Sequence, residues 1–426
     1  MVPALVPLVR RSQSAAEILV SVLTFTVFTI LDFLDAIFCV FYAYLDEFLE
    51  GSASQCHCHK REETGKNENV CDRENQLSET LYGRENIFRE LGLLRLRRKS
   101  EQSIKSAGNL NSNRWSDCGC ESCLSWMKNG DLKLHVAVQE SSAGDSTENV
   151  VFFHGFMSSS SHWTETVFKH LSEPLKENYR LIAVDLLGFG RSPKPRDISY
   201  TLRDHLEMIE KSVIFPYNLK SFHLVAHSMG CVIALALAAR YPESVKSLTL
   251  VAPPYFPSSV EGASLSALNK IAGKRLWPPL LFGAALMSWY EHLGRTVCFL
   301  VCRNHGLWES ILRLLTRKRD LDFAIIDLTR HTHHSAWHTM HNVICGGAAL
   351  IDDYLETISK HKIKFTIIQG DCDRVVPLEC SYNIKRKVPD VDVLIVPNTD
   401  HTTVSISRKT EFTRDLEHIW LGEVGL

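Results

Sequence analysis

Apolar residues in this 426-residue chain follow two alternating patterns. Short, uninterrupted apolar runs are typical of strands buried on both faces, and they alternate with longer runs that have helical spacing. The helical runs lie near 162–174, 201–214 and 230–240. The predicted strands cover residues 132–139, 150–154, 181–185, 222–227, 247–252, 364–370 and 391–397. This alternation predicts an α/β fold with a mostly parallel sheet that helices cover on both faces.

The most informative motif is the pentapeptide from Ala226 to Gly230, which joins a predicted strand to a predicted helix and places Ser228 at its centre. A serine on such a turn projects its Oγ from the sheet edge, where the first N–H groups of the helix face a developing negative charge. Small residues at both ends of the motif let strand and helix pack closely, although Ala226 stands where glycine is usual. We therefore expect Ser228 to be a nucleophile and the Met229 N–H to be an oxyanion donor.

A candidate acid and a candidate base follow in the order that this kind of site requires. Asp373 comes directly after the strand at 364–370, and His401 follows the strand at 391–397. The carboxyl ends of parallel strands meet at one edge of a sheet, so these side chains are expected beside Ser228. The spacing Asp-x-x-Val-Pro favours Asp373 as the acid, with Asp371 as the alternative that we expect to brace the turn.

The strand at 150–154 runs into His154-Gly155-Phe156. A turn of this kind points a backbone N–H at the oxyanion, so Phe156 is the expected second donor, with His154 and Gly155 supporting the loop. The sequence Gly188-Phe-Gly190 is an incomplete nucleotide-binding motif, and we interpret it as a structural turn. These motifs in this order predict an α/β-hydrolase fold whose chemistry needs no cofactor and no metal.

The stretch at about 255–345 interrupts the strand pattern of the predicted hydrolase domain, residues 130–426, where a cap over the site is expected. Its apolar residues between 276 and 290 would suit an acyl chain, or would form the core of the cap itself. His334, His338 and His341 would share one helical face. We interpret this face as polar rather than metal-binding, because serine chemistry needs no metal.

Residues 1–50 form an apolar signal or anchor segment in which Arg10 and Arg11 precede an uncharged run at 18–31. Asp32 and Asp35 interrupt the apolar pattern and make an ordinary single span unfavourable. A signal peptide, a signal anchor, an interfacial hairpin and a buried helix are all compatible with it. The basic residues favour a cytoplasmic N-terminus, which would place the hydrolase in the secretory pathway, at the cell membrane or the cell wall.

Residues 51–129 are polar and are predicted to be a linker that carries cysteines. These cysteines would form disulfides if the domain is exported, or could hold zinc in the cytosol, and we assign no metal. They are Cys56, Cys58, Cys71, Cys118, Cys120 and Cys123. We expect the later ones to be buried apolar residues; they are Cys231, Cys298, Cys302, Cys345, Cys372 and Cys380. The net charge of −2 gives no reason to expect nucleic-acid binding.

The arrangement resembles the plant BODYGUARD family of α/β-hydrolases. The resemblance rests on the apolar N-terminus, on His154 to Ser160, on the elbow from Ala226 continuing through Cys231-Val-Ile-Ala, and on Gly370 to Pro377. It covers nearly the whole chain. It implies a probable lysophospholipase or lipid-ester hydrolase of epidermal cells, connected with cuticle and cutin formation and placed at the membrane or cell wall.

We therefore predict a serine hydrolase that cleaves fatty-acyl esters by two-step acyl transfer through Ser228, His401 and Asp373. A transacylase with the same three residues would deliver the acyl group to a hydroxyl, as in polyester synthesis. A ligand receptor built on a hydrolase scaffold is the non-enzymatic alternative. Turnover of an ester separates the receptor from the two enzymes.

Overall fold

The computed structural model describes residues 5–51, 56–58, 70–82, 84–91, 114–126, 132–142, 144, 148–257 and 262–422. The structure does not describe the side chains before residue 17 or those of residues 70 and 71. The prediction that Cys71 forms a disulfide or a zinc site therefore lies outside the described residues.

A seven-stranded sheet forms the centre of the molecule, with the strand order β1-β3-β2-β4-β5-β6-β7. Only β1 runs antiparallel to its neighbour, and the other pairs are parallel. The strands are β1 (Val136–Gln139), β2 (Glu148–Phe153), β3 (Tyr179–Val184), β4 (Phe222–His227), β5 (Val245–Val251), β6 (Lys364–Gly370) and β7 (Asp392–Val396). The mostly parallel sheet confirms the predicted fold class, and the main difference is that β1 begins four residues later than expected.

Helices cover both faces of the sheet because successive strand residues point to opposite sides. In β2, Val151 and Phe153 enter one core, and Val150 and Phe152 enter the other. The first core is completed by α7 (Leu202–Ile209), α8 (Met229–Arg240), α15 (Ile351–Lys360) and α16 (Glu379–Lys387). The second core is completed by α5 (Ser161–Thr166), α6 (Glu173–Asn178) and α18 (Lys409–Leu421).

Two of the predicted helices are interrupted. The run at 162–174 divides into α5, a short 3₁₀ turn η2 (Phe168–His170) and α6, which has Pro174 in its first turn. The run at 201–214 is α7 followed by the π-helical turn η3 (Glu210–Ile214). Both changes leave the buried face intact.

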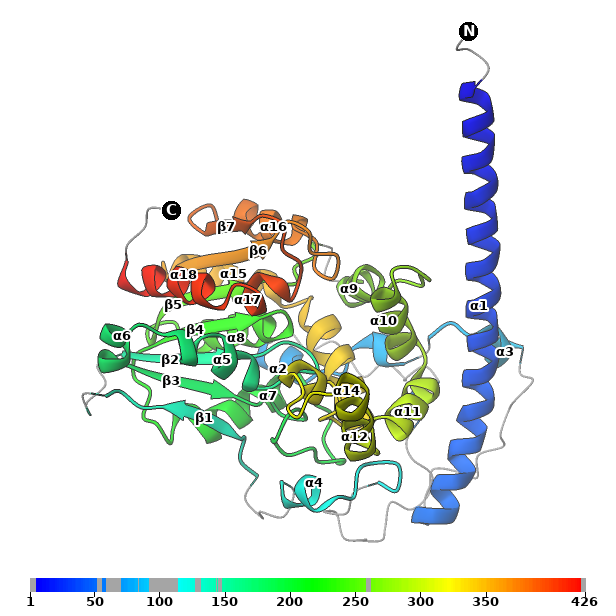
Figure 1. The fold of residues 1–426 in the computed structure, drawn as a ribbon, viewed down its shortest axis with the longest axis horizontal. Coiled ribbons are helices and arrows are strands. Elements are labelled where there is room, and N and C mark those ends of the chain that lie inside the picture. Colours follow the sequence, from blue (N-terminus) through cyan, green and yellow to red (C-terminus); the bar gives the residue numbers. More distant parts are fainter. Residues whose placement is uncertain are drawn as a thin grey trace.

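In the sequence, a group of helices follows β5 and precedes β6; it lies beside the sheet, and we call it the cap (Figure 1). Its members are α9 (Ala263–Ala272), α10 (Pro279–Trp289), α11 (Glu291–Leu300), α12 (His305–Thr316), α13 (Phe323–Asp327) and α14 (His333–Thr339), followed by the π-helical turn η4 (Met340–Cys345). The helix α17 (Thr403–Ile406) follows β7. The cap is therefore built from helices only, within the part of the chain that the structure describes.

The N-terminal segment is one continuous helix, α1 (Leu5–Glu50), so the interfacial hairpin is excluded. Figure 1 shows its N-terminal part extending beyond the body, with α10 and α11 between α1 and the sheet. The cap side chains Phe282 and Tyr290 pack against Phe28 of α1, with ring centroids 6.1 and 6.4 Å apart. Ala284 and Trp289 from the same run pack against the main core. The apolar content at 276–290 is therefore shared between α1 and the body.

Several described pieces of 51–129 are held against the body and do not lie free as a linker would. They include α2 (Val70–Glu74), η1 (Glu79–Leu81), α3 (Ile87–Glu90) and α4 (Glu121–Ser125). Glu74 is buried and pairs with Arg240 at 2.6 Å. Arg84 is buried and lies over the Trp337 ring of the cap, 4.3 Å from its centroid.

Candidate active site

Ser228 lies on a strained turn between β4 and α8. Its φ of 52° and ψ of −119° are sparsely populated by residues with a side chain, and its N–H donates to the Val251 carbonyl at 2.9 Å. A Cβ at Gly230 would lie 2.7 Å from the His154 carbonyl oxygen, so only glycine fits there. Ala226 is completely buried, and its methyl group is accommodated in the core. The elbow thus tolerates alanine at its first position and requires glycine at its last.

His401 stands between Ser228 and Asp373. Its Nε2 lies 3.0 Å from the Ser228 Oγ, and its Nδ1 lies 2.8 Å from the Asp373 Oδ2. Both distances are those of hydrogen bonds. The loops after β4, β6 and β7 bring the three side chains together at one edge of the sheet. This is the arrangement in which an imidazole can take a proton from a hydroxyl while a carboxylate orients the ring.

Asp373 is fixed by three N–H donors in addition to His401. Its Oδ1 accepts from Val375 N at 2.8 Å and from Val376 N at 2.9 Å, and its Oδ2 accepts from Gln369 Nε2 at 3.0 Å. The side chain is completely buried. These donors hold the orientation of the carboxylate. Asp371 is exposed, and the structure brings Asp373, not Asp371, to His401.

The loop from His154 to Phe156 passes directly over the nucleophile. A Cβ at Gly155 would lie 2.8 Å from the His227 Nδ1 and 3.3 Å from the Ser228 Cβ, so this close approach needs glycine. Met229 is the first residue of α8, where a backbone N–H has no acceptor in a preceding turn. The loop and the start of α8 therefore face the same side of Ser228.

His154 braces this loop. Its Nε2 lies 2.9 Å from Leu186 N and must accept, so Nδ1 carries the hydrogen and donates to the Gly155 carbonyl at 2.7 Å. The side chain is completely buried, and burial lowers the pKa of His154. A neutral imidazole that is fully engaged by backbone groups acts as a support and not as a base.

His227 is a site residue that the sequence analysis did not identify. Its Nε2 donates to the His401 carbonyl oxygen at 2.9 Å, and its ring lies 4.8 Å from the His401 ring and 5.1 Å from the His162 ring. Burial holds the pKa of His227 well below its usual range, so the ring is neutral. His227 therefore positions the loop that carries His401. Its place beside Ser228 was the only signal in the sequence.

The turn at Gly188 and Gly190 packs against the segment that follows Phe156, and Asp185 fills the space beside Gly190. Asp185 accepts from Ser160 N at 2.6 Å and from Arg191 N at 2.7 Å. A Cβ at Gly190 would lie 2.3 Å from the Asp185 Oδ2, and Gly190 has a φ of 53°. The interpretation as a structural turn agrees with these contacts.

The cap touches the same region through Asp327. Its Oδ2 accepts from the Ser159 Oγ at 2.7 Å, three residues beyond Phe156. Burial raises the pKa of Asp327 to about 7. This contact connects α13 to the loop beside the nucleophile.

Comparison with known proteins identifies the family of the chain. The model of the α/β-hydrolase fold matches residues 148–275. Probable lysophospholipase BODYGUARD 4 of Arabidopsis thaliana is 54% identical over 409 residues, which cover 93% of this chain and 96% of that protein. The chain belongs to the BODYGUARD family of α/β-hydrolases. Probable lysophospholipase BODYGUARD 5 of Arabidopsis thaliana is 48% identical, over 96% of this chain and 97% of that protein.

BODYGUARD membership confirms the predicted fold, the family resemblance and the expected enzyme class, a carboxylic-ester hydrolase. A more distant relative is Lipase 1 of Psychrobacter immobilis, which is 26% identical over 60% of this chain and 71% of that protein. That match covers part of the chain only. The N-terminal segments are shared with the BODYGUARD proteins, whose matches extend over nearly the whole chain.

Proposed function

We propose that this BODYGUARD protein hydrolyses fatty-acyl esters, with lysophospholipids as the leading substrates, through Ser228. The observation that carries the proposal is the position of His401, which bridges the Ser228 Oγ and the buried Asp373 carboxylate at 3.0 and 2.8 Å. The strained serine and the glycine-lined loop above it are further support.

The reaction consists of two acyl transfers. His401 Nε2 takes the Ser228 proton as Oγ attacks the ester carbonyl, and Asp373 stabilises the imidazolium that forms. The N–H groups of Phe156 and Met229 hold the oxyanion, and His401 then gives the proton to the leaving alcohol. Water, deprotonated by His401, attacks the acyl-enzyme and releases the fatty acid and Ser228.

The proposed substrate class follows the family. The BODYGUARD relatives are named as probable lysophospholipases, and a more distant relative is named a lipase. The apolar cap run at 276–290 gives weaker support than its composition alone would, because Phe282 and Tyr290 of this run pack against Phe28 of α1. The role in cuticle formation rests on the family resemblance.

We place the enzyme at a membrane because of α1. The helix over residues 17–50 is long and apolar enough to cross a bilayer, and its exposed apolar residues Ile18, Leu19 and Phe25 precede the part, from Phe28 on, that contacts the cap. Arg10 and Arg11 favour translocation of the domain that follows. In microsomes, a C-terminal tag should resist protease until detergent is added. Digestion of the tag in intact vesicles would place the hydrolase in the cytosol.

The function is tested by incubating the full chain in detergent with lysophospholipid, monoacylglycerol and hydroxy-fatty esters, with and without an acceptor alcohol. We expect free fatty acid as the product, at a rate that rises with acyl length and disappears in Ser228→Ala. A new ester as the main product would identify a transacylase. No turnover of any ester by the folded protein would favour a receptor.

A further inference from the structure

Three groups of cysteine and histidine side chains outside the active site bring their donor atoms together. Within the described residues they are Cys39, Cys56, Cys58 and His292; Cys118, Cys120, Cys123 and His305; and Cys298, Cys302 and His331. In each group all donor atoms lie within 4.8 Å of one another. The first two groups have the same composition, three thiols and one imidazole.

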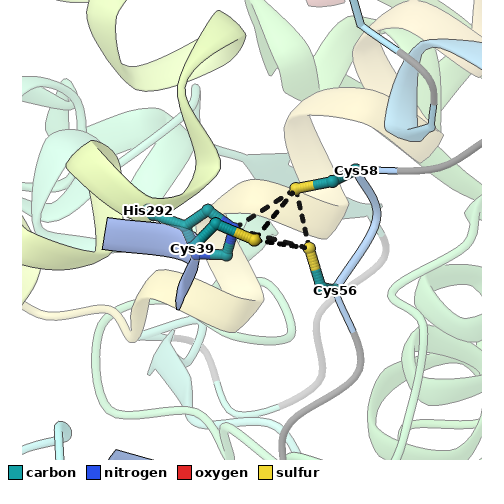
Figure 2. Close-up of side chains that lie close together, drawn as sticks. All are labelled: Cys39, Cys56, Cys58 and His292. Atoms are coloured by element: carbon teal, nitrogen blue, oxygen red, sulfur yellow. Dashed lines mark hydrogen bonds between the residues drawn. The ribbon is translucent and has the colours of Figure 1, made fainter. Parts of the chain in front are cut away.

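We propose that Cys39, Cys56, Cys58 and His292 bind one structural zinc ion, which fixes α1 to the cap. Figure 2 shows the four side chains, from α1, from the segment 56–58 and from α11, pointing toward a common centre. Three thiolates and one imidazole complete the tetrahedral shell of a closed zinc site. The proposal departs from the expectation of no metal and from the expectation that Cys56 and Cys58 form disulfides in an exported domain, and it is independent of the proposed activity.

The distances between the donors suit such a shell. Zinc bonds of about 2.3 Å to sulfur and about 2.0 Å to nitrogen give tetrahedral edges of about 3.8 Å between sulfurs and about 3.5 Å between sulfur and nitrogen. The Cys39 Sγ lies 3.6 Å from the Cys56 Sγ and 3.8 Å from the Cys58 Sγ. The His292 Nε2 lies 3.4 Å from Cys56 and 3.3 Å from Cys58. The edge between Cys56 and Cys58 is shorter, at 2.7 Å, and would lengthen when zinc enters.

Neighbouring contacts already hold the four donors in place. His57, between the two cysteines, uses its backbone N–H at 3.2 Å and its Nδ1 at 3.1 Å to reach the Glu291 carboxylate. The Asp35 Oδ1, four residues before Cys39, accepts from His292 N at 2.9 Å. The Tyr42 ring stacks on the His292 ring with centroids 6.3 Å apart. Outer contacts of this kind orient metal ligands.

Zinc accounts for the whole group better than a disulfide does. A disulfide among three thiols leaves one thiol over and gives the buried imidazole no role. An iron–sulfur cluster is usually held by four thiolates, and the imidazole at a single tetrahedral centre favours zinc. We argue the first group rather than the second, because Arg330 Nη1 also lies 3.3 Å from the His305 Nε2.

The test begins with the metal content of the full chain, purified in detergent without chelator; a separate portion of the same lysate is alkylated to record the oxidation state of its thiols. Zinc, iron and copper are measured by mass spectrometry in the wild type, Cys39→Ser, His292→Ala and Ser228→Ala. Cys380→Ala is the matched control, because this buried cysteine belongs to none of the three groups. We expect Cys39→Ser and His292→Ala to hold about one zinc ion per chain less than the wild type. The zinc content of Ser228→Ala and Cys380→Ala should equal that of the wild type.

Two measurements on the wild type keep the proposal testable if the variants do not fold. Cobalt exchanged into the protein should give the visible absorption of a tetrahedral thiolate site. Chelation should increase the rate at which trypsin separates α1 from the body. The proposal is overturned if the wild type holds no zinc, if iron replaces zinc, if Cys39 is recovered in a disulfide, or if His292→Ala retains the full zinc content.

Discussion

The sheet edge at Ser228 and the junction between α1 and α11 both bury polar groups, but the chain specifies them differently. At the sheet edge, each candidate catalytic side chain follows a strand within a few residues, so the strand order alone brings Ser228, Asp373 and His401 together. At the junction, Asp35 meets the start of α11, 257 residues away in the sequence. The first region can be predicted from local pattern, and the second depends on long-range contacts that leave no local pattern.

The largest effect should come from the proposed catalytic acid. Asp373→Asn should lower kcat by about 10⁴-fold, because the imidazole loses control of its tautomer and the carboxylate that stabilises its charged form. Asp371→Asn is the matched control and should change kcat little, because Asp371 is exposed. Steady-state kinetics on a soluble ester would measure both. A larger loss in Asp371→Asn would show that the acid is assigned wrongly.

The junction should be most sensitive at Asp46. This carboxylate makes two contacts of 2.7 Å with Arg295, and both side chains are buried. Asp46→Ala leaves the arginine unpaired, and removing one partner of a buried pair costs about 3–5 kcal/mol. We expect trypsin to cleave the chain between α1 and the cap much faster than in the wild type. The remaining body of the protein should still be labelled by a fluorophosphonate.

The control for this change is Lys169→Ala, which removes the exposed pair of Lys169 with Glu165. An exposed pair contributes little, so the rate of cleavage should not change. Equal cleavage of Asp46→Ala and the wild type would show that Asp46 does not hold α1 in place.

A smaller effect, on pH dependence, should come from the contact between Asp327 of the cap and Ser159. Burial raises the pKa of Asp327 to about 7 from the ordinary 3.8. A raised folded pKa favours folding fully below about pH 3.8, and this contribution is lost as pH rises through about 7. The wild type should therefore lose stability relative to Asp327→Asn over this interval.

The difference between the two Tm values, followed from pH 4 to pH 8, measures this contribution. Asparagine keeps an oxygen that can accept from the Ser159 hydroxyl, so the contact itself is conserved. A difference that does not change with pH would show that Asp327 does not titrate in this range.

The sequence predicted the sheet and the positions of Ser228, Asp373 and His401, because each follows an apolar strand whose period is visible. The role of His227 was not predicted, because the sequence alone does not show which residues a histidine in a buried strand will contact. Asp35 was interpreted as an interruption of an apolar helix, whereas it accepts from two N–H groups at the start of α11. The apolar pattern of α1 does not indicate that α11 packs against it.

The cysteines show the same limit. Cys298 and Cys302 are buried as expected, but their thiols also contact the His331 imidazole, which their apolar surroundings do not predict. Cys372 was expected to be buried and is exposed, because it follows β6 on the turn that carries Asp373. Cys39, on α1, was not grouped with Cys56 and Cys58 because only the fold brings them together.

The most direct test of the central claim is active-site labelling with a fluorophosphonate. The probe forms a covalent bond with a serine whose hydroxyl is activated by a neighbouring base. We expect the wild type to be labelled on the peptide containing Ser228 and Ser228→Ala not to be labelled, while the thermal unfolding of the variant is unchanged. Labelling of the folded Ser228→Ala protein at the wild-type rate, or ester turnover by it, would place the nucleophile elsewhere and contradict the account.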